Sequence, residues 1–188
     1  MGVTPGLYYT TIDMSFDNGL GDVDSIKKNI LLLENVSEKM TAIISPSDNS
    51  YWLVSFASNI SPTVYDMFYS YKINSTGINL INQSTFTFTY PQSTINSGGQ
   101  MKISPDKLSL AMIHNTLGNN GETDVAESLF TFNFDSNTGI LSSLQSNFFT
   151  IDVKFNYGLE FSPDSSLLYF TNTDSFFDGS DYWKNISD

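Results

Sequence analysis

Alternation of apolar and polar residues with a period of two is the main pattern along this chain. Short runs rich in aromatic and β-branched residues are separated by clusters of Gly, Asn, Asp, Ser and Pro. This pattern predicts β-strands joined by turns, because successive side chains of a strand point to opposite faces. Strands are predicted at residues 7–12, 41–45, 51–57, 65–73, 77–90 (with a break inside), 101–104, 108–115, 126–134, 140–151, 158–162 and 167–173.

The apolar run within residues 27–33 is ambiguous, because its pattern suits a helix or a strand. Its short length and flanking loops favour a strand that pairs with residues 7–12. Polar connectors are predicted at 13–25, 91–99 and 117–124, and a Ser-, Asp- and Gly-rich tail at 174–181. No helix is predicted.

One stretch of sequence recurs along the chain. It is clearest at residues 99–112 and 157–170, and a looser copy covers residues 39–54. Each copy has a Ser-Pro turn, at Pro46, Pro105 and Pro163, and these prolines lie 59 and 58 residues apart. Proline presets φ at the first central turn position, and a following Asp can accept a hydrogen bond from nearby backbone. Self-similarity at a fixed period indicates a repeat architecture.

Each full repeat also contains a later hairpin, whose turn ends at Gly77 in one copy and at Gly139 in the next. A four-stranded unit of roughly sixty residues is typical of a β-propeller blade. The predicted fold is therefore all-β, a partial β-propeller of about three four-stranded blades, the first and last of them incomplete. A β-sandwich would use similar strands but gives no reason for the even spacing of the turns.

The predicted organisation is a single propeller segment over residues 1–188. An incomplete leading blade covers 1–37, blades cover 38–96 and 97–155, and a truncated blade covers 156–188, whose second hairpin is expected beyond residue 188. Residues five and seven positions after each proline share a face by period two. That face is expected to pack between neighbouring blades: Tyr51, Leu53, Leu110, Met112, Leu168 and Phe170.

Composition narrows the possible partners. The formal net charge is −12 and the sequence has no arginine, which disfavours nucleic acid and anionic membrane surfaces. There is no cysteine, so neither disulfides nor thiol chemistry is expected. The first residues have no basic and apolar leader pattern, so no signal peptide is predicted in this chain. No run approaches 18 apolar residues, so membrane insertion is not expected.

The motifs Gly-Gln-Met-Lys-Ile-Ser-Pro-Asp (99–106) and Tyr-Gly-Leu-Glu-Phe-Ser-Pro-Asp (157–164) resemble the Ser-Pro-Asp-Gly blades of TolB-type, WD40-like (PD40) propellers. With residues 7–13, 38–42 and 51–54, they resemble more narrowly the propeller region of secreted surface proteins of Bacteroidetes, of the type IX secretion and gliding-motility kind. The resemblance extends over nearly the whole chain. It implies an extracellular or cell-surface module for recognition or spacing, attached to the remainder of a propeller. Lys107 and Ser165 replace the usual turn glycine, so these turns are predicted not to need positive φ.

Three side chains are candidates for a binding face or a central channel. His114 is the only histidine, and no nucleophile motif accompanies it, which favours a structural or surface role. Lys102 and Glu160 occupy equivalent positions in neighbouring repeats. They are predicted to form a solvated pair, with an inter-blade or channel-lining ion pair as the alternative.

Two acidic loops are candidates for calcium, which takes hard oxygen ligands, although neither has EF-hand spacing and solvated loops are the alternative. Their carboxylates are Asp17, Asp22, Asp24, Asp174, Asp178 and Asp181. No other cofactor is predicted. Trp52, Tyr182 and Trp183 could stack on sugars, although core packing suits Trp52 equally well.

These features favour a non-enzymatic propeller module that binds or presents a protein or glycan through loops on one face. The alternative is a hydrolase or lactonase on the same scaffold, with ligands partly supplied by further blades. A purely structural spacer is a third possibility. The sequence itself names no ligand, because propellers support many unrelated functions.

Overall fold

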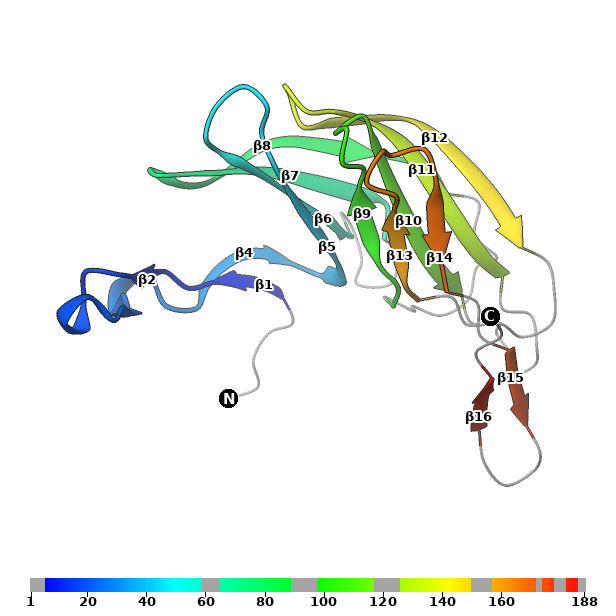
Figure 1. The fold of residues 1–188 in the computed structure, drawn as a ribbon, viewed down its shortest axis with the longest axis horizontal. Helices are drawn as coiled ribbons and strands as arrows, with labels where there is room; N and C mark the ends of the chain where they lie inside the picture. The colour runs from blue at the N-terminus through cyan, green and yellow to red at the C-terminus, as the bar shows by residue number, and fades with distance from the viewer. Residues whose placement is uncertain are drawn as a thin grey trace. The chain divides into compact units, whose positions relative to one another are not determined.

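The computed structural model of the chain describes residues 6–58, 65–88, 98–116, 126–149, 157–171, 174–177 and 182–185 (Figure 1). These residues form an all-β structure, without an α-helix and with two three-residue 3-10 helices. None of the described helices is long and apolar enough to cross a membrane. The chain divides into two compact units, residues 1–36 and residues 37–188.

The first unit contains two small antiparallel pairs. Strand β1 (Gly6–Tyr9) pairs with β4 (Ile30–Glu34), which confirms a strand within residues 27–33 and its pairing with the first strand. Strand β2 (Ile12–Asp13) pairs with β3 (Asp22–Val23). The predicted loop at 13–25 therefore contains short regular elements, β3 and the 3-10 helices η1 (Asp17–Gly19) and η2 (Ser25–Lys27).

The second unit contains two four-stranded antiparallel sheets. The first sheet has the order β5-β6-β7-β8, and the second has the order β12-β11-β10-β9, so sequential strands are neighbours in both. The strands of the first sheet are β5 (Val36–Ile44), β6 (Tyr51–Ala57), β7 (Met67–Asn74) and β8 (Gly77–Thr85). The strands of the second are β9 (Met101–Ile103), β10 (Ser109–Thr116), β11 (Ala126–Asp135) and β12 (Ile140–Phe149). The predicted strands are confirmed, with boundaries shifted by a few residues and β5 beginning five residues earlier. The predicted segment 77–90 is a strand only to residue 85: residues 86–88 are not in a strand, and residues 89–90, 150–151 and 172–173 lie outside the described residues.

Two further hairpins follow the second sheet. Strands β13 (Leu159–Phe161) and β14 (Leu168–Phe170) pair with each other and lie beside β9 and β10 (Figure 1). Strands β15 (Asp174–Phe177) and β16 (Tyr182–Asn185) pair as a separate two-stranded sheet. The prediction of a polar tail at 174–181 was therefore wrong for β15, because Phe176 and Phe177 give this segment strand character that its Ser and Asp content obscured.

The three Ser-Pro turns close in the same way. The backbone N–H of the serine before each proline donates to the carbonyl five residues later, with N–O distances of 2.8 Å at Ser45 and 2.9 Å at Ser104 and Ser162. In the second and third copies the serine hydroxyl also donates to the aspartate two residues on, at 2.5 and 2.6 Å. The repeat seen in the sequence is therefore a repeat of backbone geometry.

The expectation that these turns avoid positive φ was wrong. Lys107 has φ of 66° and Ser165 has φ of 63°, in the left-handed region that glycine adopts at least cost. The hydrogen bonds of the turn fix this conformation: the Lys107 N–H donates to the Ser104 carbonyl at 2.8 Å, and the Ser165 N–H to the Ser162 carbonyl at 2.9 Å. In the second and third copies, the N–H of the serine before the proline also donates to the carbonyl five residues later, and the tight reversal places these two residues in the left-handed region; no residue of the first copy's turn has positive φ.

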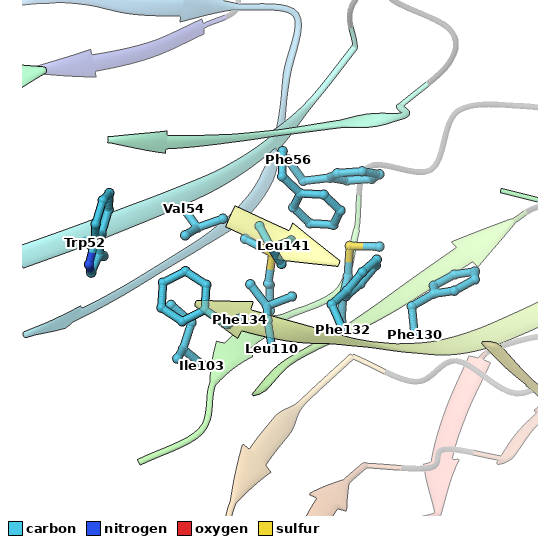
Figure 2. Packing of buried hydrophobic residues seen from close by; sticks show 12 residues of the cluster. Trp52, Val54, Phe56, Ile103, Leu110, Phe130, Phe132, Phe134 and Leu141 are labelled. Carbon is cyan, nitrogen blue, oxygen red and sulfur yellow. The ribbon is translucent and has the colours of Figure 1, made fainter. Parts of the chain in front are cut away.

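The main core lies between the two four-stranded sheets. Figure 2 shows Trp52, Val54 and Phe56 directed toward side chains of the second sheet. Aromatic rings make many of the contacts; Phe68 and Phe132, for example, have centroids 4.9 Å apart in an edge-on arrangement. The fully or nearly fully buried residues of this core are Trp52, Val54, Phe56, Phe68, Met101, Ile103, Leu110, Met112, Phe130, Phe132, Phe134 and Leu141.

Hydrogen bonds also join the first sheet to the turn between β11 and β12. The Trp52 indole N–H donates to the Ser136 carbonyl at 2.7 Å, and the Ser70 hydroxyl donates to the Gly139 carbonyl at 2.7 Å. Gly139 has φ of 74°, and a Cβ there would lie 2.5 Å from the Trp52 ring. This glycine therefore permits both the turn conformation and the close approach of the indole.

A second, smaller core joins the second sheet to β13 and β14. It contains Ala111, Ile113 and Leu159, with Phe161 and Leu168 packed against it. The prediction that the face with residues five and seven after the proline packs between repeats is therefore confirmed for the second sheet, and the opposite face packs as well. Leu110 and Met112 face the first sheet as predicted, while Ala111 and Ile113, on the opposite face, contact the third repeat. Both faces of the second sheet are buried, because it has a neighbour on each side.

We call the face with residues five and seven after the proline the leading face. The opposite face, with residues six and eight after the proline, is the trailing face. At both cores, the trailing face of one repeat is covered by the leading face of the next repeat. The leading-face residues Tyr51 and Phe170 depart from the prediction, because they are 51% and 39% exposed.

Candidate functional site

Three repeats meet where their first strands begin, around the carboxylate of Glu38. Glu38 lies in β5 of the first sheet, and its Oε1 accepts a hydrogen bond from the N–H of Gly99, just before β9, at 3.0 Å. The hydroxyl of Tyr157, just before β13, lies close to the same carboxylate, which influences its pKa as a hydrogen-bond partner. We call the group Glu38, Lys39, Gly98, Gly99 and Tyr157 the first-strand junction.

The geometry of the junction depends on Gly99. This residue has φ of 109°, and a Cβ at its position would lie 2.5 Å from the Ile113 carbonyl oxygen. A larger residue would therefore displace the segment that presents its N–H to Glu38. The Glu38 hydrogen bond, followed by its negative charge, raises the pKa of the Tyr157 hydroxyl above its ordinary value of 10.0. The tyrosine is consequently a neutral hydrogen-bond donor across the physiological range.

Lys39 is the buried cation of the junction. Its side chain is 1% exposed, and its ammonium donates to the Gly98 carbonyl across the gap between the first and second sheets. Burial lowers the pKa of Lys39 from 10.5 to about 7, and the negative charge of Glu38 opposes this shift only in part. Near neutral pH, Lys39 is therefore present in both its charged and neutral forms.

His114 lies close to Lys39 but is deeply buried. It is on β10, is 5% exposed, and its ring centroid lies 6.0 Å from that of Phe56 in an edge-on arrangement. Burial, and then the charge of Lys39, lowers the pKa of His114 to about 3, so the ring is neutral at physiological pH. Ser55, at the equivalent position of the first sheet, is also fully buried, and its hydroxyl has no hydrogen-bond partner among the described residues.

Lys102 and Glu160 form an ion pair between the second and third repeats, with an Nζ–Oε2 distance of 2.8 Å. Their side chains are 35% and 64% exposed, so this is a solvated inter-repeat pair. Exposed pairs of this kind contribute about 0–1 kcal/mol to stability. Of the three predicted channel or face candidates, these two are brought together, whereas His114 lies in the main core between the first two sheets.

The predicted calcium loops are only partly within the described residues. Asp22 Oδ1 accepts from the N–H of Val23, and Asp24 Oδ1 caps η2 by accepting from the N–H of Ile26, while Asp17 begins η1. No group of three His, Cys, Asp or Glu side chains that could hold a metal ion occurs in the described part of the chain. In the second loop, Asp174 begins β15, and Asp178 and Asp181 lie outside the described residues. Calcium binding stays a prediction.

Of the three candidate sugar-stacking residues, the structure describes the side chain of Trp52 only. Trp52 is 1% exposed and packs edge-on against Phe134, so core packing accounts for it. The side chains of Tyr182 and Trp183 lie outside the part of the structure described at side-chain level. Tyr157 is the exposed aromatic that belongs to a polar site, with 52% of its side chain accessible beside Glu38.

The first-strand junction was not predicted from the sequence. Glu38 and Lys39 are adjacent charged residues in a polar stretch, and Tyr157 precedes a strand. Only Gly98-Gly99 carried a usable signal, because paired glycines before a strand indicate close approach of another backbone. The contacts that define the junction join residues about sixty positions apart, which local patterns do not reveal.

Comparison with known proteins gave no match: no protein family, curated protein or solved structure is similar to this chain at the level that would show a relationship.

Proposed function

We propose that this chain is part of a β-propeller of the Ser-Pro-Asp-Gly type that acts as a non-enzymatic binding module. Serial packing of a trailing face against the next leading face supports this arrangement, since propeller blades contact only their neighbours. The positive φ of Lys107 and Ser165 also supports it, because these two residues stand where the family that the chain resembles has glycine.

The observation that carries the binding role is the pairing of Tyr157 with Glu38. An accessible aromatic ring beside an exposed carboxylate offers an apolar surface and strong hydrogen-bond acceptors within one small area. Sugars complement this site, because their apolar C–H faces can stack on the ring and their hydroxyl groups can donate to the carboxylate. We therefore favour a neutral glycan as the ligand, with a protein partner as the other outcome.

Placement of the module outside the cell, at the surface of a bacterium of the Bacteroidetes type, follows from the resemblance in sequence motifs. The acidic composition is compatible with a ligand that is neutral or carries positive charge, because a net charge of −12 repels polyanions. Secretion by the type IX route and a role in gliding motility belong to the same proposal.

The hydrolase or lactonase alternative receives less support. Such an enzyme needs its acid, base or nucleophile in contact with substrate. His114 and Lys39 are the described side chains with the most strongly shifted basic pKa values, and both are almost wholly buried between sheets. No observation in the described residues favours this alternative over binding.

The test is a glycan array with the whole chain, followed by calorimetry on any ligand found. Tyr157→Ala should abolish binding, and Tyr157→Phe should weaken it less, because the ring is kept and only the hydroxyl is lost. The matched control is Tyr169→Ala, which removes another exposed tyrosine, 59% accessible, from strand β14. Ligands that bind equally well to Tyr157→Ala would overturn the assignment of the site. A protein captured through Tyr157 without any glycan signal would replace the glycan with a protein ligand.

A further inference from the structure

The main chain around Tyr157 is held by a residue of the neighbouring repeat. The Tyr157 carbonyl accepts a hydrogen bond from the N–H of Gln100, just before β9, at 2.9 Å. The N–H of Leu159 donates to the side-chain Oε1 of the same glutamine, also at 2.9 Å. Gln100 therefore holds the chain on both sides of Gly158.

Thr171, just after β14, holds the same segment from within the third repeat. Its Oγ1 accepts from the N–H of Gly158 at 2.8 Å and from the N–H of Tyr157 at the longer distance of 3.4 Å. Its own N–H donates to the Gly158 carbonyl at 3.0 Å. Each main-chain N–H and carbonyl from the Tyr157 N–H to the Leu159 N–H thus has a partner, and Gln100 and Thr171 supply all of them.

The repeat itself does not require the Thr171 hydroxyl. Counted from the prolines, Thr171 corresponds to Ile113, and Gly158 corresponds to Gln100. The N–H of Ile113 donates to the Gln100 carbonyl at 3.0 Å, which is the same main-chain bond made without a hydroxyl. The Gln100 side chain has no counterpart at Gly158. These two side chains therefore add hydrogen bonds at Tyr157 that the repeated fold does not need.

A fixed main chain limits the positions that the Tyr157 ring can take. Its hydroxyl lies close to the Glu38 carboxylate of the first repeat, and about half of the residue is accessible. A side chain that already occupies its binding position loses less conformational entropy when a ligand arrives. Contacts from the second and third repeats therefore prepare this ring for binding.

We infer that Thr171 and Gln100 are positioning residues, which hold Tyr157 in place for its ligand. The inference rests on the proposed binding site at Tyr157, and it adds the two side chains that preorganise that site. Neither has to touch the ligand, because Thr171 acts through the N–H of Gly158 and Gln100 acts through the N–H of Leu159.

The first measurement uses the whole chain without a ligand. In isotope-labelled tyrosine, the chemical shift of the phenolic Cζ reports the surroundings of each hydroxyl, and Tyr157→Phe identifies the signal of Tyr157. Glu38→Gln gives the position of that signal when the negative charge is absent. Thr171→Val removes only the hydroxyl acceptor and should move the signal toward that position, as should Gln100→Met. Thr171→Ser keeps the hydroxyl and should retain the wild-type shift.

Thr76→Val is the matched control, because it removes an exposed threonine hydroxyl that donates to Asn74 in the turn between β7 and β8. It should leave the Tyr157 signal unchanged. A signal that stays at its wild-type position in Thr171→Val overturns the role of Thr171, and in Gln100→Met that of Gln100. The methyl signals of Leu159 should keep their positions in both variants. Their loss would assign a general structural role instead and would also overturn the inference.

The second measurement is a titration with the neutral methyl glycosides of glucose, galactose and mannose. For a glycoside that binds the wild-type chain, Thr171→Val and Gln100→Met should weaken binding by about three- to tenfold, the cost of immobilising one more side chain. Thr171→Ser and Thr76→Val should bind as the wild type does, and unchanged affinity in Thr171→Val and Gln100→Met overturns the inference. The two proposals fail separately. Absence of any ligand contradicts the proposed function, whereas the Tyr157 signal in the free chain decides whether Thr171 and Gln100 position that side chain.

Discussion

The buried ammonium of Lys39 makes the stability of the protein depend on pH in a range where few other groups titrate. Burial lowers the pKa of Lys39 in the folded chain from 10.5 to about 7. Between these two pH values the unfolded chain binds more protons than the folded chain at this residue. Stability therefore rises with pH through this window, and it falls as pH decreases toward the folded pKa.

The size of the effect follows from the pKa difference. One pKa unit corresponds to about 1.4 kcal/mol, so raising the pH from 7 to 9 should increase the free energy of unfolding by about 2 kcal/mol. Lys39→Met keeps an unbranched side chain and removes the charge, at the cost of leaving the Gly98 carbonyl without this donor. At pH 7 we expect a net stabilisation of about 1–3 kcal/mol, and little remaining pH dependence over this range.

Urea unfolding followed by circular dichroism, at pH 7 and at pH 9, measures both quantities. Lys102→Met is the matched control, because Lys102 is in a solvated ion pair and its substitution should leave the pH dependence in place. The pH range stops below 10 because burial raises the pKa of Tyr65, Tyr69 and Tyr71. Their ionisation at higher pH favours unfolding, since a raised folded pKa means that stability is lost above the unfolded value. A wild-type chain with equal stability at pH 7 and pH 9 would refute the reasoning.

Two further predictions concern backbone geometry, and both are read from urea unfolding. Lys107→Gly should stabilise the chain by about 0.5–1 kcal/mol, because Lys107 has φ of 66°, which glycine adopts without strain. Leu108→Gly is the control and should not stabilise the chain. Equal effects of the two substitutions would contradict this account. Gly139→Ala should destabilise the chain by about 2–4 kcal/mol, because the new Cβ meets the Trp52 ring and the backbone is left-handed. Gly77→Ala is its control, since Gly77 also has positive φ but open space at the Cβ position, and a cost equal to that of Gly139→Ala would show that the ring contact is unimportant.

Strands and turns could be predicted because their signals are local. Period-two alternation placed β6 at residues 51–57, and the Ser-Pro turns gave the spacing of the repeats. Backbone angles within those turns could not be predicted from residue type, because the positive φ of Lys107 comes from reversing the chain between two hydrogen bonds, Lys107 N–H to the Ser104 carbonyl and Ser104 N–H to the Ser109 carbonyl. At Lys107 the hydrogen bonds of the turn outweigh the energetic cost of a left-handed backbone conformation.

The first-strand junction shows why the candidate site was missed. In β5, alternation would place Met40 inside and Lys39 outside, yet Met40 is 52% exposed and Lys39 is 1% exposed. The orientation of the strand is set farther along, where Ile43 packs against the main core, and period two then directs Lys39 to the same side. A lysine in that position is tolerated because the carbonyl of Gly98 lies within reach of its ammonium.

Serial stacking also explains the apolar character of both faces. A strand in a two-layer protein alternates apolar with polar residues, but Leu110, Ala111, Met112 and Ile113 are consecutive and buried, since their sheet has a neighbour on each side. The same pattern continues in β14 as Leu168, Tyr169 and Phe170, where Leu168 is half-buried and Tyr169 is exposed. Tyr157 is exposed in a different setting, just before β13 and close to the Glu38 carboxylate, so its ring is accessible to a ligand beside that carboxylate.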